Sequence, residues 1–124
     1  MVKLDHLAIT VRDYQASRDW YVKHLGLRVE FEIPDRRTAA LQDDAGLTLF
    51  VAEDPGKPIA TCVLTFQVDD VEKKHAELAA AGVKVVHLPS RRFWGYGAEL
   101  EDPDGYPVWL WDERTMREKS GEPT

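Results

Sequence analysis

The chain carries an internal repeat. Three pairs of short segments match in the same order along its two halves: "TVRD" with "QVDD", "LGLRV" with "AGVKV", and "LQDDAGLTLFV" with "LEDPDGYPVWL". The members of each pair lie about 57 to 59 residues apart. Repetition at that length indicates a duplicated supersecondary unit. Each half is therefore expected to form the same arrangement of strands and helices.

Each half is predicted to contain one strand, one helix and three further strands. The expected helices, counted with their capping residues, run from Asp13 to Gly26 and from Asp69 or Asp70 to Gly82. Alternation of apolar and polar residues predicts the strands. They span about 4–11, 28–33, 38–43 and 47–52 in the first half, and 61–68, 84–88, 97–101 and 107–112 in the second.

These elements predict an α+β fold of two βαβββ modules in a single domain, 1–124. Module one spans 1–53 and module two spans 61–112. Between them, 54–60 has the composition of a linker. The polar tail, 113–124, is charged, and we expect it to fray.

Charge and cysteine content narrow the classes of partner. The formal net charge is −6, which argues against a nucleic-acid partner because such proteins need a basic surface. No signal peptide or membrane-spanning stretch is visible, so no membrane partner is expected. Cys62 is the single cysteine, and a cytoplasmic location is the simplest expectation. Because Cys62 alternates with Leu64 and Phe66, we expect its side chain to face the core.

The last predicted strand, "VWLWD", is apolar on both faces. Successive side chains of a strand point to opposite sides, so Trp109 and Trp111 share one face while Val108 and Leu110 share the other. Val108 and Leu110 fit the side that meets a helix. The tryptophan face must be covered by further core, by a partner chain or by a ligand.

Three long segments give the chain a resemblance to a known family: "LDHLAITVRDYQASRDWYVKHLGLRV", "FQVDDVEKKHAELAAAGVKVV" and "WGYGAELEDPDGYPVWLWD". They resemble the vicinal-oxygen-chelate superfamily, which includes glyoxalases, bleomycin-resistance proteins and extradiol dioxygenases. The resemblance implies two modules that form a curved mixed sheet around a cavity, with helices on the outer face. The fold of this family supports many chemistries and also plain binding proteins.

The resemblance also locates the metal ligands of the family's enzymes. It maps them onto His6, Phe50, Val63 and Trp109, with Phe50 uncertain by one residue. Catalytic metal sites need nitrogen, oxygen or sulfur donors, typically three or more from the protein. Of these four residues only His6 supplies one. We therefore predict that the chain binds no metal and needs no cofactor, closest in character to the metal-free bleomycin-resistance-like members.

With no metal, Trp109 and Trp111 become the expected walls of a small-molecule pocket. Planar or cationic ligands suit such walls through stacking and cation–π attraction. The segment "PSRRFWGYG", residues 89–97, reads as a loop that forms either a lid or a dimer contact. The candidate ligand-binding residues are His6, Phe50, Val63, Arg92, Trp94, Tyr96, Trp109 and Trp111.

Three functions remain open from the sequence. The first is a metal-free protein that sequesters an aromatic or cationic compound, as antibiotic-resistance members of the family do. The second is an enzyme of the lyase, isomerase or dioxygenase type, with His6 as its catalytic acid or base or with an unrecognised metal site. The third is a dimer without a ligand. The resemblance implies a homodimer in each case.

Overall fold

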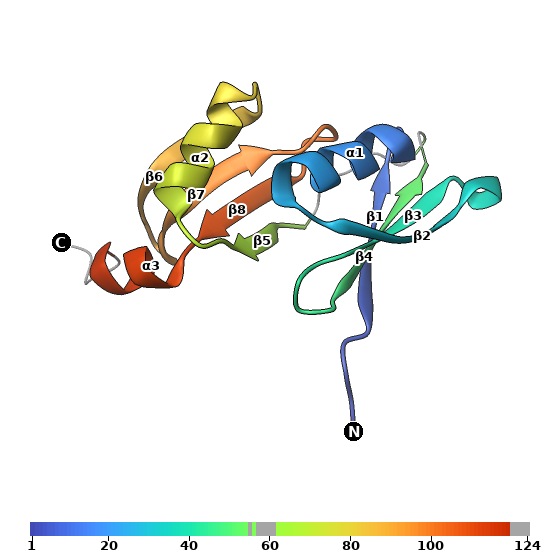
Figure 1. The fold of residues 1–124 in the computed structure, drawn as a ribbon, viewed down its shortest axis with the longest axis horizontal. Helices are drawn as coiled ribbons and strands as arrows, with labels where there is room; N and C mark the ends of the chain where they lie inside the picture. The colour runs from blue at the N-terminus through green and yellow to red at the C-terminus, as the bar shows by residue number, and fades with distance from the viewer. Residues whose placement is uncertain (55, 57–61, 120–124) are drawn as a thin grey trace. The chain divides into compact units, whose positions relative to one another are not determined.

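A computed structural model of the chain describes residues 1–54, 56 and 62–119. It divides into two compact units, Met1–Ile59 and Ala60–Thr124 (Figure 1). Each unit contains its own four-stranded mixed sheet and its own helix between the first and second strands. The predicted α+β fold with two βαβββ modules is confirmed.

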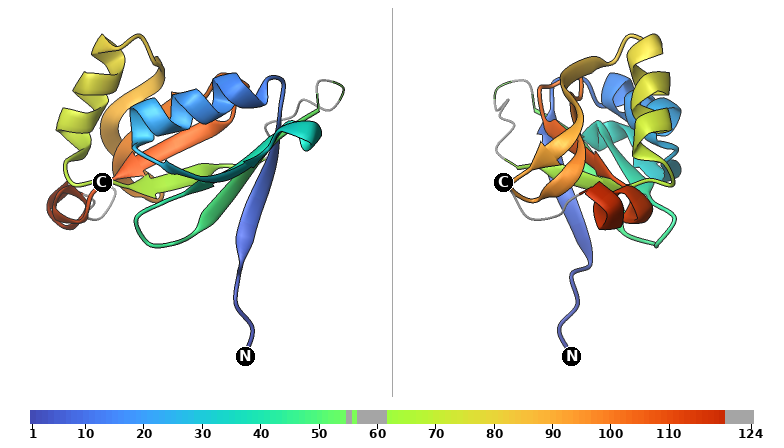
Figure 2. Two further views of the ribbon diagram at one scale, coloured as in Figure 1. Left: turned by 45° about the vertical axis from the view of Figure 1, so that its right-hand side comes forward. Right: turned by 90° about the vertical axis from the view of Figure 1, so that its left-hand side faces the viewer.

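The first unit contains β1 (His6–Val11), β2 (Arg28–Ile33), β3 (Thr38–Gln42) and β4 (Thr48–Glu53), in the sheet order β1-β4-β3-β2. β1 runs parallel to β4, and the other neighbours are antiparallel. Helix α1 (Tyr14–Leu25) lies along one face, and a short 3-10 helix, η1 (Pro34–Arg36), joins β2 to β3 (Figures 1 and 2).

The caps of α1 are those the sequence predicts. The Asp13 carboxylate accepts hydrogen bonds from the backbone N–H groups of Gln15 and Ala16. At the other end Gly26 adopts a left-handed conformation with φ of 71°. Side chains on the helix side of the sheet are buried, namely Ile9, Val11, Leu41, Leu49 and Val51. The opposite face of this sheet is therefore the more open one.

The second unit repeats this plan. β5 (Leu64–Gln67), β6 (Lys84–Arg92), β7 (Gly95–Glu101) and β8 (Pro107–Trp111) form a sheet in the order β5-β8-β7-β6. Helix α2 (Val71–Ala80) follows β5, and the Asp70 carboxylate caps it by accepting the N–H of Lys73. The side chains of Leu64, Leu100, Val108 and Leu110 are buried on the helix side.

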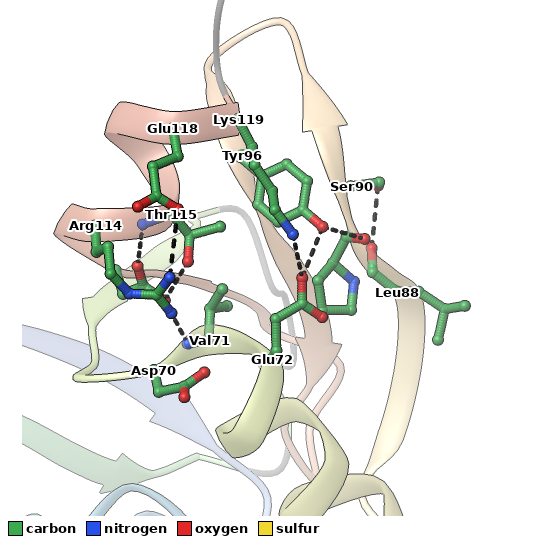
Figure 3. A network of polar contacts seen from close by, with 12 residues as sticks. Asp70, Val71, Glu72, Leu88, Ser90, Tyr96, Arg114, Thr115, Glu118 and Lys119 are labelled. Atoms are coloured by element: carbon green, nitrogen blue, oxygen red, sulfur yellow. Dashed lines mark hydrogen bonds and ion pairs between the residues drawn. The ribbon is translucent and has the colours of Figure 1, made fainter.

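The charged tail does not fray over its first part, contrary to the prediction. Residues Glu113–Lys119 form helix α3. The buried carboxylate of Asp112 accepts hydrogen bonds from the N–H and hydroxyl of Thr115, at 2.5 and 2.9 Å, and from the N–H of Val71 at 2.6 Å (Figure 3). One side chain thus caps both α2 and α3. The remaining residues, 120–124, lie outside the described part of the chain.

The prediction of a loop at 89–97 is wrong. β6 continues to Arg92 and pairs with β7 from Gly95 onward, so only Phe93 and Trp94 form the turn. The segment is a tight hairpin rather than an irregular loop, because cross-strand pairing carries both strands through the Pro, Ser, Gly and Arg residues. Pairing registers such as Arg91 with Tyr96 cannot be read from local propensity.

Cys62 is exposed, so the prediction that it faces the core is wrong. β5 begins at Leu64, two residues later than the alternation required. Most of the expected linker, 55 and 57–60, lies outside the described residues, as does Thr61. Among the helices of the described ranges, none combines the length and apolar character needed to cross a membrane.

Candidate functional site

Aromatic rings gather on the open face of the first sheet. His6 and Phe50 are brought together, with ring centroids 4.8 Å apart and planes at 66°. Phe31, which is 43% exposed, meets Phe50 edge-on at 5.7 Å. The parallel register pairs Ala8 with Phe50, so Phe50 and His6 share one face. The structure therefore places the rings of His6 and Phe50 on the same side of the sheet.

His6 is held by its neighbour in sequence. Its Nδ1 atom lies 2.9 Å from the carboxylate of Asp5. The hydrogen bond and the charge attraction to His6 both lower the pKa of Asp5. The imidazole is exposed. The contact with Asp5 orients the imidazole of His6, and the ring stays accessible to solvent.

Trp109 is the centre of the open face in the second unit. Its indole N–H donates a 2.8 Å hydrogen bond to the carboxylate of Glu99, which lies directly opposite it on β7. The sheet register places Thr65 on its other side, and His87 beyond Glu99. Trp109 is half-buried, while its sequence neighbours Val108 and Leu110 are fully buried on the helix side. The alternation read from "VWLWD" is what the structure contains.

Trp94 folds back from the hairpin turn and stacks on Trp109. The two ring centroids are 5.0 Å apart and their planes differ by 9°. Gly97 makes the approach possible, since a Cβ atom there would overlap both the Trp94 ring and the Leu110 carbonyl oxygen. Phe93, at the tip of the turn and 95% exposed, meets Trp109 edge-on at 6.4 Å. We call Phe93, Trp94, Glu99 and Trp109 the aromatic platform.

Tyr96 is not part of this platform. It follows the alternation of the buried Ala98 and lies toward the helices, where its hydroxyl donates to Glu72 at 2.8 Å and contacts the Pro89 carbonyl at 3.2 Å (Figure 3). The Lys119 ammonium lies 5.2 Å above its ring. Burial and the hydrogen bond to Glu72 raise the pKa of Tyr96 to about 12. Its contacts join β7 to α2 and α3.

The other candidate residues are more loosely placed. Trp111 is half-buried and pairs with Gln67; it lies two residues beyond Trp109 on β8. Val63 precedes β5 and is 44% exposed. Arg92 is exposed at the end of β6, opposite Gly95. A polar surface depression of about 280 Å³ is lined by Gln67, Val68, Asp69, Glu113, Arg114 and Arg117, and so does not include the platform.

The four residues to which the resemblance assigns the family's ligand positions, His6, Phe50, Val63 and Trp109, do not have the donor atoms to hold a metal. The first unit offers one donor there, His6, and the second offers none, because Val63 and Trp109 lack a ligating atom. Across the described residues no group of three or more His, Cys, Asp or Glu side chains is placed to hold an ion. Glu99 beside Trp109 adds a single carboxylate, already hydrogen-bonded to the indole.

A comparison of sequences establishes the family. The profile of the Glyoxalase/Bleomycin resistance protein/Dioxygenase superfamily matches residues 3–110. The chain belongs to this superfamily. The match spans both repeated units, in agreement with the resemblance drawn from the three quoted segments.

Individual proteins that the chain is similar to are distant from it in sequence. The uncharacterized protein YaeR from Escherichia coli (strain K12) is 27% identical over 128 residues, covering 90% of this chain and 96% of YaeR. TnmS3, an antibiotic binding protein from Streptomyces sp. CB03234, is 26% identical with a TM-score of 0.76, covering 90% of this chain and 96% of TnmS3. A superfamily member from Sphaerobacter thermophilus DSM 20745 has a TM-score of 0.78 at 20% identity, covering 91% and 98%, and shows the shared fold.

Two participants in these clusters were not anticipated. Phe31 joins His6 and Phe50 across a β-bulge between Val29 and Phe31, and a bulge shifts the face to which later residues point. Glu99 was missed because alternation gives the face of a residue but not its neighbour on the next strand. The sequence did contain one indication of Glu99. It lies in "GAELED", next to the turn that leads into the strand of Trp109.

Proposed function

We propose that this protein binds planar aromatic small molecules at the aromatic platform, without a metal and without changing them chemically. The observation that carries the proposal is the pair Trp94 and Trp109. A half-buried indole stands where the resemblance would place a carboxylate ligand, and a second indole stacks on it at 5.0 Å. Flat rings offer large contact areas at low conformational cost, which favours other flat rings.

One protein that the chain is similar to supports this proposal more than family membership does. Glyoxalases, dioxygenases and bleomycin-resistance proteins share the fold, so membership alone does not choose between catalysis and binding. TnmS3 is described as an antibiotic binding protein and is 26% identical to this chain. Its function favours sequestration of a small molecule, and resistance to a toxic aromatic compound is the role we propose. The exposed, unpaired thiol of Cys62 suits a reducing cytoplasm.

The test is a titration of tryptophan fluorescence with a panel of planar aromatic compounds. A ligand that stacks on the platform should quench emission, and Trp109→Ala should weaken its binding by about thirtyfold, the loss typical of removing an aromatic anchor. Trp20→Phe is the matched control, because Trp20 lies on α1 in the other unit against Tyr21 and His24. Equal losses in the two variants would contradict the proposal.

Catalysis by His6 is the second candidate, and the contact with Asp5 favours it. A carboxylate on Nδ1 fixes the ring and leaves Nε2 to exchange a proton with a substrate. The two functions differ in the fate of the ligand. Any compound that binds should be incubated with the protein and recovered for mass spectrometry. Unchanged compound supports binding, whereas a product that disappears with His6→Ala supports an enzyme.

A further inference from the structure

Glu99 is an acidic residue beside the indole of Trp109. Among the described residues its carboxylate makes one hydrogen bond, from the Trp109 indole at 2.8 Å, and no ion pair. Glu101 lies two residues further along β7, so its side chain points to the same face of the sheet. Its carboxylate forms an ion pair with the Lys84 ammonium at 2.7 Å. The negative charge of Glu101 is thus compensated by Lys84, whereas the described part of the chain forms no such ion pair with Glu99.

The position of Glu99 puts this charge at the edge of the aromatic platform. Glu99 and Trp109 are direct cross-strand neighbours, and Trp94 covers the ring to which Glu99 is hydrogen-bonded. A hydrogen bond from the indole N–H to a carboxylate makes the ring face more electron-rich, which strengthens its attraction for a cation. Glu99 is also half-buried, so its charge is less screened than that of an exposed side chain.

We propose that the aromatic platform selects cationic aromatic ligands, and that Glu99 determines this selectivity. The inference rests on the proposed binding function and adds the charge of the ligand. The flat cation stacks on the indole faces while the carboxylate lies beside its positive charge. The overall net charge of −6 favours approach of a cation in the same sense.

Arg92 favours the opposite selectivity, for anionic ligands. Arg92 lies in the same hairpin and is exposed, so it is available to an anionic ligand. Arg92, however, makes no hydrogen bond and no cation–π interaction with either indole among the described residues, whereas Glu99 is hydrogen-bonded to one of them. The geometry therefore favours the cation, and an anionic probe decides between the two.

The experiment uses three aromatic probes of similar shape and different charge. N-methylquinolinium is cationic, 1-methylnaphthalene is its neutral isostere, and 1-naphthoate is anionic. Their dissociation constants are measured by equilibrium dialysis against the full chain and against Glu99→Gln and Glu101→Gln. Glutamine keeps an oxygen that can accept the indole N–H while removing the charge. Glu101→Gln is the control, because it removes a carboxylate from the same strand away from Trp109.

We expect Glu99→Gln to weaken the binding of N-methylquinolinium about tenfold. The dissociation constant of 1-methylnaphthalene should stay within about twofold of its value for the parent protein. Glu101→Gln should leave both unchanged. Equal weakening of the two probes by Glu99→Gln, no weakening at all, or a preference for 1-naphthoate would overturn the inference and leave aromatic binding intact. If none of the probes binds and the panel of planar compounds also fails, the proposed function falls, and this inference with it.

Discussion

Trp109 and Leu110 are adjacent residues with opposite roles. Leu110 is fully buried on the helix side of β8, whereas Trp109 is half-buried on the open side. We predict that Leu110→Ala costs about 2 to 5 kcal/mol of folding free energy through the cavity it leaves. Trp109→Ala should cost clearly less, because the lost ring is only half-buried. Urea denaturation of the two variants measures the difference.

If Trp109→Ala proves as destabilising as Leu110→Ala, the tryptophan is a core residue and the platform is packing. Trp111→Ala extends the comparison, because Trp111 shares the face of Trp109 but lies nearer the strand end. We expect it to affect both stability and ligand affinity less than Trp109→Ala.

At this scale the sequence predicted which way side chains point but not what they touch. Alternation in "VWLWD" placed both tryptophans on the open face and both aliphatic residues on the buried one. The partners depend on register between strands. β6 and β7 shift register between Val85 and His87, so the row that joins His87, Glu99 and Trp109 cannot be obtained by counting along the chain.

Each unit fastens its helix to its last strand with a carboxylate. In the second unit Asp112, 1% exposed, accepts the first N–H of α2, and in the first unit Glu53 accepts the corresponding N–H of Tyr14 at 3.1 Å. Asp112 also caps α3 through Thr115. We predict that Asp112→Asn destabilises the fold by about 1 to 2 kcal/mol. Both oxygens of the Asp112 carboxylate accept hydrogen bonds, and the asparagine amide replaces one of these acceptors with an NH₂ group that faces the donors of Val71 and Thr115. Asp69→Asn, at an exposed position beside the α2 cap, should change stability by less than about 0.5 kcal/mol.

The contribution of Asp112 should depend on pH. Burial opposes the charged form, but the hydrogen bonds from Val71 and Thr115 outweigh it and lower the pKa of Asp112. Because its folded pKa lies below its unfolded one, the stabilisation is fully present above the ordinary aspartate value of 3.8 and is lost as pH falls through the folded pKa. The free-energy gap between the parent and Asp112→Asn should therefore narrow below that value. A gap independent of pH would mean that Asp112 does not act through its charge.

Elements with local signals were predicted better than those made by tertiary contacts. The caps at Asp13, Gly26 and Asp70 are visible in the sequence and occur in the structure. The tail helix depends on Asp112, whose role requires α2 to be nearby. The β6–β7 hairpin likewise runs through residues with poor strand propensity because each strand pairs with the other.

For the whole molecule, we predict no stoichiometric metal. Of the four residues to which the resemblance assigns the family's ligand positions, only His6 has a donor atom, and a lone imidazole holds an ion weakly. Elemental analysis of protein purified without added metal should find well under one ion per chain. Stoichiometric zinc, nickel, manganese or iron that disappears in His6→Ala would contradict the prediction.

We also predict a homodimer. Each unit exposes large apolar side chains, including Phe31 and Leu7 in the first and Leu88 and Phe93 in the second. Exposed apolar and aromatic groups of this kind are typical of interface cores. Light scattering at micromolar concentration should give about twice the chain mass of 14.1 kDa. Phe93→Ser should shift the population toward monomer if the hairpin tip takes part, and a monomeric parent would rule the dimer out.

The stacked indoles of Trp94 and Trp109 should also be visible in polarised light. Two indoles held nearly parallel with centroids 5.0 Å apart couple their electronic transitions, and this coupling should add a paired positive and negative band to the circular dichroism spectrum. Trp94→Phe should abolish the pair of bands while leaving the secondary-structure signal in place. A flat ligand that inserts between the two rings would weaken this coupling and reduce the intensity of the same bands. The circular dichroism of the unlabelled protein would then report whether the binding site is occupied.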